Sequence, residues 1–348
     1  MSERFITSTL NKKDDERENS LRPLSFRDFP GQERIKEILE LTVHAARERG
    51  EPPAHILLSG PPGLGKTTLA HIVGAELKCN VKTSSGPAIE KPGDLAGLLT
   101  GMSAGDILFI DEIHRLSTTV EEYLYSAMED FFIDIVLEQG PGARSVRLNV
   151  PKFTLIGATT RQGMLSAPLR ARFGLNLRLD YYRPEILEKI LMRSAGIMDV
   201  SLDPEGAREI AIRSRGTPRI ANNLLAWARN YAIVRTSGVI SGDSAREALA
   251  MFRIEPDGLD EMDLRILETV VKNFHGGPAG LKTIAVVVGE SEDTIEEAYE
   301  PFLIREGYLV RTSRGRMATE KCWARFGLTP PAAQRNAVAP DLFDSEQP

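Results

Sequence analysis

The chain has 348 residues and a formal net charge of −6, and its composition is 42% apolar and 26% charged. This length predicts two or three domains rather than one hydrophobic core, and the acidic balance excludes a protein that coats nucleic acid non-specifically. Two cysteines make neither a disulfide framework nor a metal cluster, and without a membrane-length apolar stretch or an export signal we expect a cytoplasmic protein.

The first ordered element is expected near Leu21, because residues 1–20 are polar and charged and predict a disordered tail. After Gly31, apolar residues from Ile35 to Val43 recur at helical spacing and predict an amphipathic helix. Pro52 and its neighbour should end this helix before the next element begins.

Residues 60–67 read GPPGLGKT and fit the phosphate-loop pattern G-x-x-x-x-G-K-[ST] at every fixed position. An apolar run of strand length precedes them at 55–59, and a helical pattern follows at 68–77. Glycines let backbone amides turn toward phosphates, and the helix N-terminus adds positive potential. Lys66 would place its charge on the β- and γ-phosphates, and Thr67 would offer its hydroxyl to Mg²⁺. The pattern predicts an ATP site with Mg²⁺, against the weaker alternative of a chance turn before a helix.

The next apolar strand, 107–110, runs directly into Asp111 and Glu112. Acids at the carboxyl end of a buried parallel strand face the ligand site of an α/β fold. Asp111 would hold Mg²⁺ through water, and Glu112 would orient and deprotonate the attacking water. The alternative is a pair of acids that only cap the following helix, and the phosphate loop upstream favours the catalytic interpretation.

A third strand of this kind spans 153–160 and ends in hydroxyl side chains, among them Thr159, which are placed to sense the γ-phosphate. Arg170 and Arg172 follow shortly, just before a Phe-Gly pair. Two such arginines suggest a finger aimed at a nucleotide. Taken alone, these residues favour the alternative of a solvated surface pair.

Between the second and third strands, residues 131–137 and 145–150 flank a Gly-Pro-Gly segment and predict an inserted β-hairpin. Its first arm, which contains Ile133 and Ile135, is apolar on both faces. A hairpin that projects into solvent does not need two apolar faces. This arm is therefore either buried or a hydrophobic docking site.

Helical periodicity continues from 184 to 252 and predicts a small all-α domain. A Gly-Pro break at 215–219 interrupts it, and Arg219 lies where this break meets the next helix. A solvated arginine is the plain alternative to a role at the nucleotide. Residues 254–258 resemble a linker in composition.

Residues 259–328 contain three helical patterns followed by a strand, a tight turn and a second strand over 308–318. Three helices and a β-wing are typical of a winged helix. The wing carries the positive charges of Arg311, Arg314 and Arg316 and no acid. This charge favours DNA contact over protein contact, and an ordinary solvated hairpin is the alternative. The polar, proline-rich residues 329–348 predict a second disordered tail.

Five sequence blocks carry a resemblance to a known family, and they span residues 60–68, 85–94, 111–116, 157–161 and 215–222. Together they resemble the RuvB family, the bacterial Holliday-junction branch-migration ATPases of the AAA+ class. The resemblance runs from about residue 21 to residue 328. It implies an α/β AAA+ core with a parallel sheet over 21–182, a small all-α lid domain over 183–253 and a winged-helix DNA-binding domain over 254–328.

The resemblance also implies an ATP-driven ring motor, a hexamer, that translocates duplex DNA to move Holliday junctions in recombination and repair. Its partners would be the junction arms, a RuvA-like junction-binding protein and, indirectly, a RuvC-like resolvase. The residues leave two alternatives: a clamp loader or replication-initiator switch of the same superfamily, and a scaffold with a degenerate ATPase. The wing argues against the clamp loader, and intact Lys66, Asp111 and Glu112 argue against the scaffold.

Several single residues take roles at the nucleotide by this resemblance. Leu21 and Arg22 would contact the adenine side, and Tyr182 would close on the nucleotide at the domain junction. Thr159 would be the first sensor and Arg219 the second. The phosphates and Mg²⁺ would be held by Gly63, Lys66, Thr67 and Thr68.

A second set would act between molecules. Arg172 would be the arginine finger given to a neighbouring subunit, with Arg170 as the fallback. The neighbour's nucleotide would also be faced by Glu129, Asp130 and Phe131. Arg311 and Arg316 would touch DNA phosphates, and the hairpin around Ile133 and Ile135 would dock on the RuvA-like partner. One departure from the family is acidic: residues 291–293 read SED where a basic residue is common, so the wing remains the better expectation for DNA.

Overall fold

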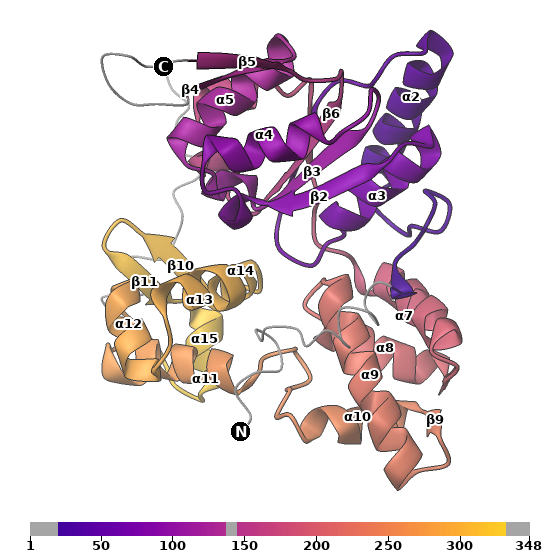
Figure 1. Ribbon diagram of the computed structural model, residues 1–348. Coiled ribbons are helices and arrows are strands. Elements are labelled where there is room, and N and C mark those ends of the chain that lie inside the picture. Colours follow the sequence, from indigo (N-terminus) through magenta and orange to yellow (C-terminus); the bar gives the residue numbers. More distant parts are fainter. Residues whose placement is uncertain (1–19, 137–144, 332–348) are drawn as a thin grey trace, which may run out of the picture.

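The computed structural model describes residues 20–136 and 145–331, which form a large α/β domain, a small helical domain and a winged domain in chain order (Figure 1). The expected tails lie outside these residues except for Ser20 and residues 329–331, and so does the turn of the expected hairpin. In this part of the chain, every helix is too short or too polar to cross a bilayer.

A parallel sheet forms the centre of the large domain, with the strand order β2–β3–β6–β1–β7. The strands are β1 (Ile56–Ser59), β2 (Val81–Ser85), β3 (Ile107–Asp111), β6 (Thr154–Thr159) and β7 (Leu175–Arg178). β6 lies between β1 and β3, and Ser59 is in register with Thr159. The carboxyl ends of these three strands therefore bring the phosphate loop, the Asp-Glu pair and the Thr159 region to one edge, where α/β sheets bind ligands.

Alternation along the strands divides the apolar side chains between two layers. Ile56 and Leu58 face the layer that contains α2 (Glu33–Arg49) and α3 (Lys66–Leu77), whereas Leu57 faces the opposite layer. The opposite layer contains α4 (Pro92–Thr100) and α5 (Thr118–Glu129). Because both faces are covered, the strands read as nearly continuous apolar runs, which is why the sequence predicted three of them.

The inserted hairpin is present: β4 (Phe132–Val136) pairs antiparallel with β5 (Ser145–Asn149). Ile133 lies opposite Leu148 and is 0% exposed, inside the layer formed with α4 and α5. The expectation that Ile133 docks on a partner is therefore wrong for this fold, because strand alternation turns its side chain into the core. Ile135 is paired with Val146 in the ladder, but its side chain lies outside the described part.

The small domain consists of α7 (Pro184–Ile197), α8 (Pro204–Arg213), α9 (Pro218–Arg235) and α10 (Gly242–Ala250). A two-residue parallel ladder, β8 (Ser201–Leu202) with β9 (Val239–Ile240), adds to the expected all-α pattern. Its core is continuous with the α2–α3 layer of the large domain.

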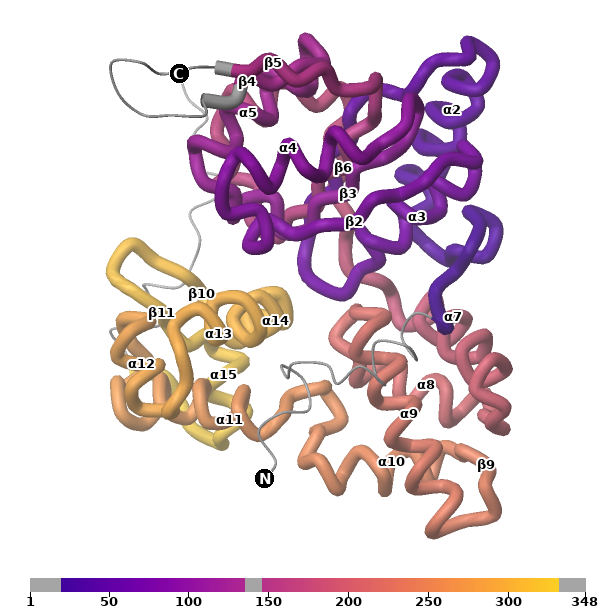
Figure 2. Tube along the Cα trace, viewed as in Figure 1, coloured from indigo at the N-terminus to yellow at the C-terminus, as the bar shows by residue number. Residues whose placement is uncertain are grey.

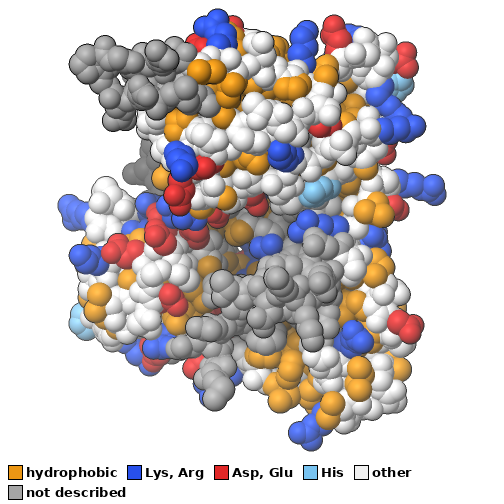
Figure 3. Space-filling model, in the orientation of Figure 1, with side chains coloured by type: hydrophobic (Ala, Val, Ile, Leu, Met, Phe, Trp, Pro, Cys, Tyr) orange, Lys and Arg blue, Asp and Glu red, His pale blue; other side chains and the backbone are white. Residues whose placement is uncertain are grey.

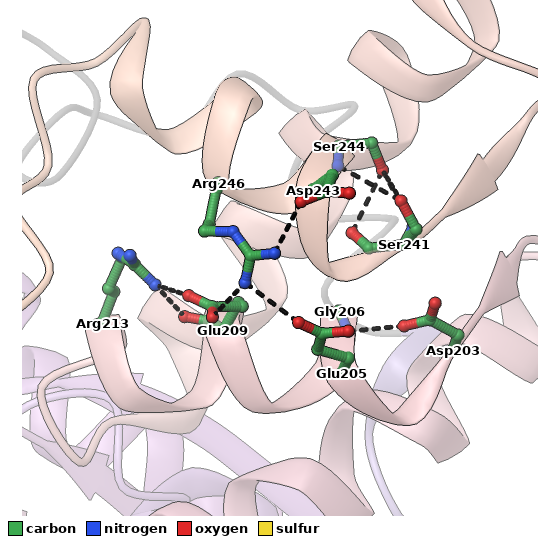
Figure 4. A network of polar contacts seen from close by, with 9 residues as sticks. All are labelled: Asp203, Glu205, Gly206, Glu209, Arg213, Ser241, Asp243, Ser244 and Arg246. Atoms are coloured by element: carbon green, nitrogen blue, oxygen red, sulfur yellow. Dashed lines mark hydrogen bonds and ion pairs between the residues drawn. The ribbon is translucent and has the colours of Figure 1, made fainter.

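A polar network ties α10 to α8 (Figure 4). The guanidinium of Arg246 contacts Glu209 at 2.6 Å, Glu205 at 3.1 Å and Asp243 of its own helix at 2.6 Å. Glu209 also pairs with Arg213 at the end of α8. The Glu209 carboxylate therefore links α10 to the C-terminal end of α8, which the 215–219 segment follows in the chain.

The winged domain has its own apolar core. It contains α11 (Glu261–Glu268), α12 (Leu281–Val288), a third helical stretch and the wing, β10 (Leu309–Thr312) with β11 (Gly315–Ala318). The third stretch is made of α13 (Glu292–Thr294), a π-helical turn (Ile295–Tyr299) and α14 (Glu300–Arg305). These elements confirm the predicted winged helix, and α15 (Glu320–Arg325) follows them. The domain lies below the large domain and beside the small one (Figures 1 and 2).

Candidate active site

One cavity of about 760 Å³ lies where the three domains meet. It collects most of the residues that the sequence assigned to the nucleotide, although they come from distant parts of the chain. These are Leu21, Arg22, Gly63, Lys66, Thr67, Thr68, Asp111, Glu112, Tyr182 and Arg219.

The phosphate loop forms the floor of this cavity and touches the small domain. Gly63 has a φ of 74°, and a Cβ at this position would lie 2.8 Å from the Thr217 Cγ2 and 2.9 Å from the Arg219 Cβ. The Arg219 amide also points at the Gly63 carbonyl, with N–O 3.4 Å. Only glycine fits this close approach, so the backbone of the loop packs directly against the start of α9.

Lys66 is 7% exposed, and its ammonium donates to the carbonyls of Gly60 and Pro61, both at 2.8 Å. Burial lowers the pKa of Lys66 to about 8, Asp111 opposes this shift, and Arg219 adds to it. Carbonyl oxygens carry only partial charge, and among residues 20–136 and 145–331 no carboxylate lies within ion-pair distance of this ammonium. It is positioned to prefer a phosphate.

The acid pair ends β3. Glu112 adopts a left-handed backbone conformation, with φ 47°, and its amide donates to the Asp111 Oδ1 at 2.9 Å. The Glu112 carboxylate contacts the guanidinium of Arg115 at 2.9 Å and remains 43% exposed. A half-exposed carboxylate that is held from one side can accept a proton from water on the other.

Thr159 is 1% exposed and, within the described residues, does not line the cavity, whereas Thr160 does. The Thr159 Oγ1 accepts a hydrogen bond from the Arg161 amide at 3.0 Å and lies 3.0 Å from the His114 Nδ1. Nothing in the position of His114 along the sequence indicated this contact. The sensor role of Thr159 stays a prediction.

The winged domain supplies one side of the cavity, which the sequence did not predict. Thr294, Glu297 and Ala298 line it. Arg161 of the large domain reaches this side, and its Nη2 lies 2.8 Å from Glu297 and 3.4 Å from Glu296. Acidic and basic side chains gather along this seam between the two domains (Figure 3). The acidic departure noted in residues 291–293 thus lies beside Arg161, because Asp293 is 3.8 Å from the same Nη2.

The opposite side is formed by the small domain and the segment that leads into it. The Tyr182 hydroxyl donates to the Leu64 carbonyl at 3.2 Å, and the Tyr182 amide donates to the Gly216 carbonyl at 2.9 Å. The Leu21 carbonyl accepts from the Arg193 guanidinium at 2.7 Å. Lining residues that the sequence missed are Phe29, Pro30, Ile190, Arg193, Asn222, Asn223, Ala226, Trp227 and Asn230. Apart from Arg193, these side chains are apolar or amides, which suit a nucleobase and its hydrogen-bonding edge.

The residues expected to face a neighbouring subunit lie together, outside the lining of this cavity. The Arg172 Nη2 contacts the Glu129 Oε2 at 3.0 Å. Asp130 is exposed at the end of α5, and Phe131 follows it with φ 55°. Arg170 is also exposed on α6 (Ala167–Ala171).

The three wing arginines differ in their surroundings. Arg311 is 58% exposed and contacts Glu296 at 3.1 Å, and Arg314 is exposed at the tip. Arg316 is 11% exposed and forms a two-point ion pair with Glu300, which is itself 4% exposed. This enclosed and neutralised guanidinium argues against a contact with DNA phosphates, and the expectation that Arg316 touches them stays a prediction.

The oxygen donors of Thr67 and Asp111 line the cavity together and fit Mg²⁺. This ion keeps several waters and binds through one or two protein oxygens plus substrate phosphates. A dedicated cluster of histidine, cysteine and acidic side chains is absent from residues 20–136 and 145–331, and Mg²⁺ does not require one.

Three family models match consecutive parts of the chain. They describe a Holliday junction DNA helicase RuvB P-loop domain over residues 21–179, a RuvB AAA lid domain over 182–255 and a RuvB C-terminal winged helix domain over 256–327.

Curated relatives and solved structures agree with these models. The Holliday junction branch migration complex subunit RuvB of Salinibacter ruber is 55% identical over 98% of both chains. The protein of the same name from Chlorobaculum tepidum is 58% identical over 89% of this chain and 90% of its own. The structure of the Thermotoga maritima RuvB Holliday junction branch migration motor superposes with a TM-score of 0.82 at 46% identity, covering 90% of this chain and all of that one. With its cavity and its three domains in this order, the chain belongs to the RuvB family of P-loop ATPases.

Proposed function

We propose that this chain is an ATP-driven motor that moves duplex DNA to drive branch migration of Holliday junctions in recombination and repair. One observation carries this proposal: a single cavity is lined by the phosphate loop, the acid pair, Arg219 and the winged domain. Hydrolysis and DNA contact are thus assigned to domains that share one site. The proposed units are 21–182, 183–253 and 254–328, acting in the cytoplasm, where a bacterial DNA substrate lies.

The chemistry follows from the side chains of the cavity. Lys66 would exchange the Gly60 and Pro61 carbonyls for the β- and γ-phosphates of ATP, which carry full charge. Glu112 would leave Arg115 and accept a proton from the attacking water. Thr67 and Asp111 would hold Mg²⁺, which when bound supplies positive charge to the phosphate oxygens. Arg219 and Thr159 would report the state of the γ-phosphate.

The adenine side would be held by the segment before the sheet and by the domain junction. Leu21 and Arg22 line the cavity there, and Tyr182 closes it from the junction. Thr68 and Gly63 would present backbone and hydroxyl groups to the phosphates. These contacts place the nucleotide between two domains, so that its hydrolysis changes how the domains meet.

The active assembly is proposed to be a hexameric ring. Arg172 and Glu129 pair with each other, and neither is among the described residues that line their own cavity. An arginine in this position serves a neighbour's nucleotide rather than its own. Asp130 and Phe131 would meet the same neighbour, and Arg170 remains the alternative finger.

The wing would contact duplex DNA through phosphates, which suits a motor that must not stall at preferred sequences. Arg314 and Arg311 are the exposed charges that could do this. The junction would be presented by a RuvA-like partner, and a RuvC-like resolvase would act on it without direct contact to this chain.

The test is ATP turnover with and without a synthetic four-way junction and a RuvA-like protein, followed by migration of a labelled junction into two duplexes. We expect turnover to rise only when both additions are present and migration to require ATP. The Lys66→Ala protein is the matched control and should show neither. If the junction leaves the rate of ATP turnover unchanged and no migration occurs, the result would instead favour a nucleotide switch such as a clamp loader.

A further inference from the structure

Arg172 lies at the end of a helix that is too short to orient it alone. α6 spans only Ala167–Ala171, and Arg172 is the residue that caps its C-terminus. Isolated helices of this length are unstable in water, because nucleation fixes several residues for one hydrogen bond. The direction in which Arg172 points must therefore be set by tertiary contacts.

Tyr125, on the neighbouring helix α5, contacts both ends of α6. Its hydroxyl lies 2.6 Å from the Oγ of Ser166, the N-cap residue of α6. Its ring lies under the guanidinium of Arg172, with 4.9 Å from the guanidinium carbon to the ring centroid. One side chain thus touches the beginning of the helix and the functional group at its end.

The hydrogen bonds at the Tyr125 hydroxyl form a chain in which Ser166 donates to Tyr125 and Tyr125 donates to Glu121. The Tyr125 proton goes to the carboxylate of Glu121, one turn earlier on α5, at 3.1 Å. The Ser166 Oγ accepts from the Leu169 amide at 3.3 Å, and its own proton is then left for the Tyr125 oxygen. Glu121 is 5% exposed, so the chain of bonds ends on a buried acceptor. Burial raises the pKa of the Tyr125 phenol, which keeps it a donor at neutral pH.

The Arg172 guanidinium makes one contact with an aromatic ring and two hydrogen bonds through its N–H groups. The guanidinium carbon of Arg172 lies over the Tyr125 ring, as in cation–π contacts. The N–H groups donate to the Pro168 carbonyl and to the Glu129 carboxylate, both at 3.0 Å. Glu129 is 55% exposed, so an incoming phosphate can replace it without disturbing the ring beneath.

We propose that Tyr125 is the positioning residue for the arginine finger: its ring fixes the plane of the Arg172 guanidinium, and its hydroxyl fixes the N-cap of the helix that carries it. This inference rests on the proposed role of Arg172 in a neighbouring subunit's site. Tyr125 does not touch nucleotide in this scheme. It acts on turnover only through Arg172, and only in the pocket of the adjacent molecule.

The experiment uses the full chain with junction DNA and the RuvA-like partner. Tyr125→Leu removes the ring and the hydroxyl, and Tyr125→Phe removes the hydroxyl alone. Tyr123→Leu, two residues away on the same helix, is the matched control. Because a finger contributes about 10³- to 10⁵-fold to turnover, we expect Tyr125→Leu to lower kcat by about 30- to 300-fold and Tyr125→Phe by about 3- to 10-fold. KM and ATP affinity should stay within about twofold, and Tyr123→Leu should keep its kcat.

Mixing separates positioning from general damage. A Tyr125→Leu subunit has an intact pocket, and a Lys66→Ala subunit has an intact finger, so their mixture should recover turnover across the ratio series. Damage to the fold of the large domain would harm the subunit's own pocket and would not be rescued. If Tyr125→Leu does not fold, judged by its melting transition, Tyr125→Phe carries the same mixing test.

Arg172→Ala mixed with Lys66→Ala is the reference. If this reference recovers turnover and the Tyr125 variants keep full kcat, or lose kcat without recovery, the positioning role is wrong while the trans finger stands. If the reference itself gives no recovery, with ring formation confirmed, the trans finger is wrong and the inference about Tyr125 falls with it.

Discussion

Arg316 and Glu300 form a buried two-point ion pair inside the winged domain, with Nε–Oε1 3.1 Å and Nη2–Oε2 2.7 Å. The wing residue opposite Arg316 in the ladder is Arg311, and it reaches Glu296, one turn before Glu300. Two of the three wing arginines are therefore matched to carboxylates of the third helical stretch, one enclosed and one exposed. The difference in exposure gives them different consequences when they are removed.

Arg316→Ala should destabilise the winged domain. Removing one partner of a buried pair leaves the other charge uncompensated, which costs about 3–5 kcal/mol. Denaturant unfolding of the variant measures this loss, and Arg311→Ala is the matched control, because an exposed pair contributes about 0–1 kcal/mol. Equal stabilities of the two variants would contradict the structural role of Arg316.

Arg314→Ala should weaken DNA binding without loss of stability. A contact with one phosphate releases about one counterion, so the log–log slope of affinity against salt should flatten by about one unit. The loss should be similar for duplexes of unrelated sequence, measured by fluorescence anisotropy over a salt series. A sequence-selective loss, or none, would point to a wing that contacts protein.

Ile133→Ala should cost about 2–5 kcal/mol in unfolding free energy, because it deletes buried methyl groups from a packed layer. Val146 is the matched control, since it lies on the partner strand of the same hairpin and is 41% exposed. Val146→Ala should change stability by about 0.5 kcal/mol or less. The burial of Ile133 would be contradicted if the two substitutions had the same small cost.

Glu112→Gln should bind ATP but not turn it over, because the amide cannot accept the proton of water. General-base catalysis contributes about 10²- to 10⁴-fold to the rate, so kcat should decrease by about that factor. Lys66→Ala should instead weaken nucleotide binding itself. Turnover and nucleotide affinity, measured in parallel, distinguish the two, and a Glu112→Gln protein that hydrolyses ATP near the parent rate would refute the assignment of the base.

Above about pH 8, Lys66 should take up a proton when the protein binds nucleotide. Burial holds the pKa of Lys66 at about 8 in the nucleotide-free chain, and phosphates beside the ammonium should raise it. Below this pKa the lysine is charged before and after binding, so uptake should be small. Above it the neutral amine must be protonated as phosphate binds, so affinity should fall as pH rises.

Calorimetry in buffers of different ionisation enthalpy measures this uptake at about pH 7 and about pH 9. The control is Lys66→Arg, whose guanidinium stays charged throughout. Equal uptake by the parent and Lys66→Arg would show that another group takes the proton.

Much of the fold was predictable because its signals are local. The phosphate loop carries its own backbone requirement in Gly63, and β1, β3 and β6 are covered on both faces and read as apolar runs. The sequence missed β2 and β7, which lie at the edges of the sheet and are only partly buried. An edge strand has one partner and little need for apolar side chains, so its sequence does not distinguish it from a loop.

The sequence by itself determined the phosphate loop and the acid pair of the nucleotide cavity, because each of these motifs pairs a residue type with a backbone context that chemistry demands. Tertiary structure alone decided which of two similar side chains is enclosed. Arg311 and Arg316 look equivalent along the chain, and Ile133 looks as suited to docking as to packing. Only the partners that folding brings near, Glu300 for Arg316 and the α4–α5 layer for Ile133, remove these side chains from water. The same long-range pairing placed Arg161 against Glu297, a contact between residues that have no local relation in sequence.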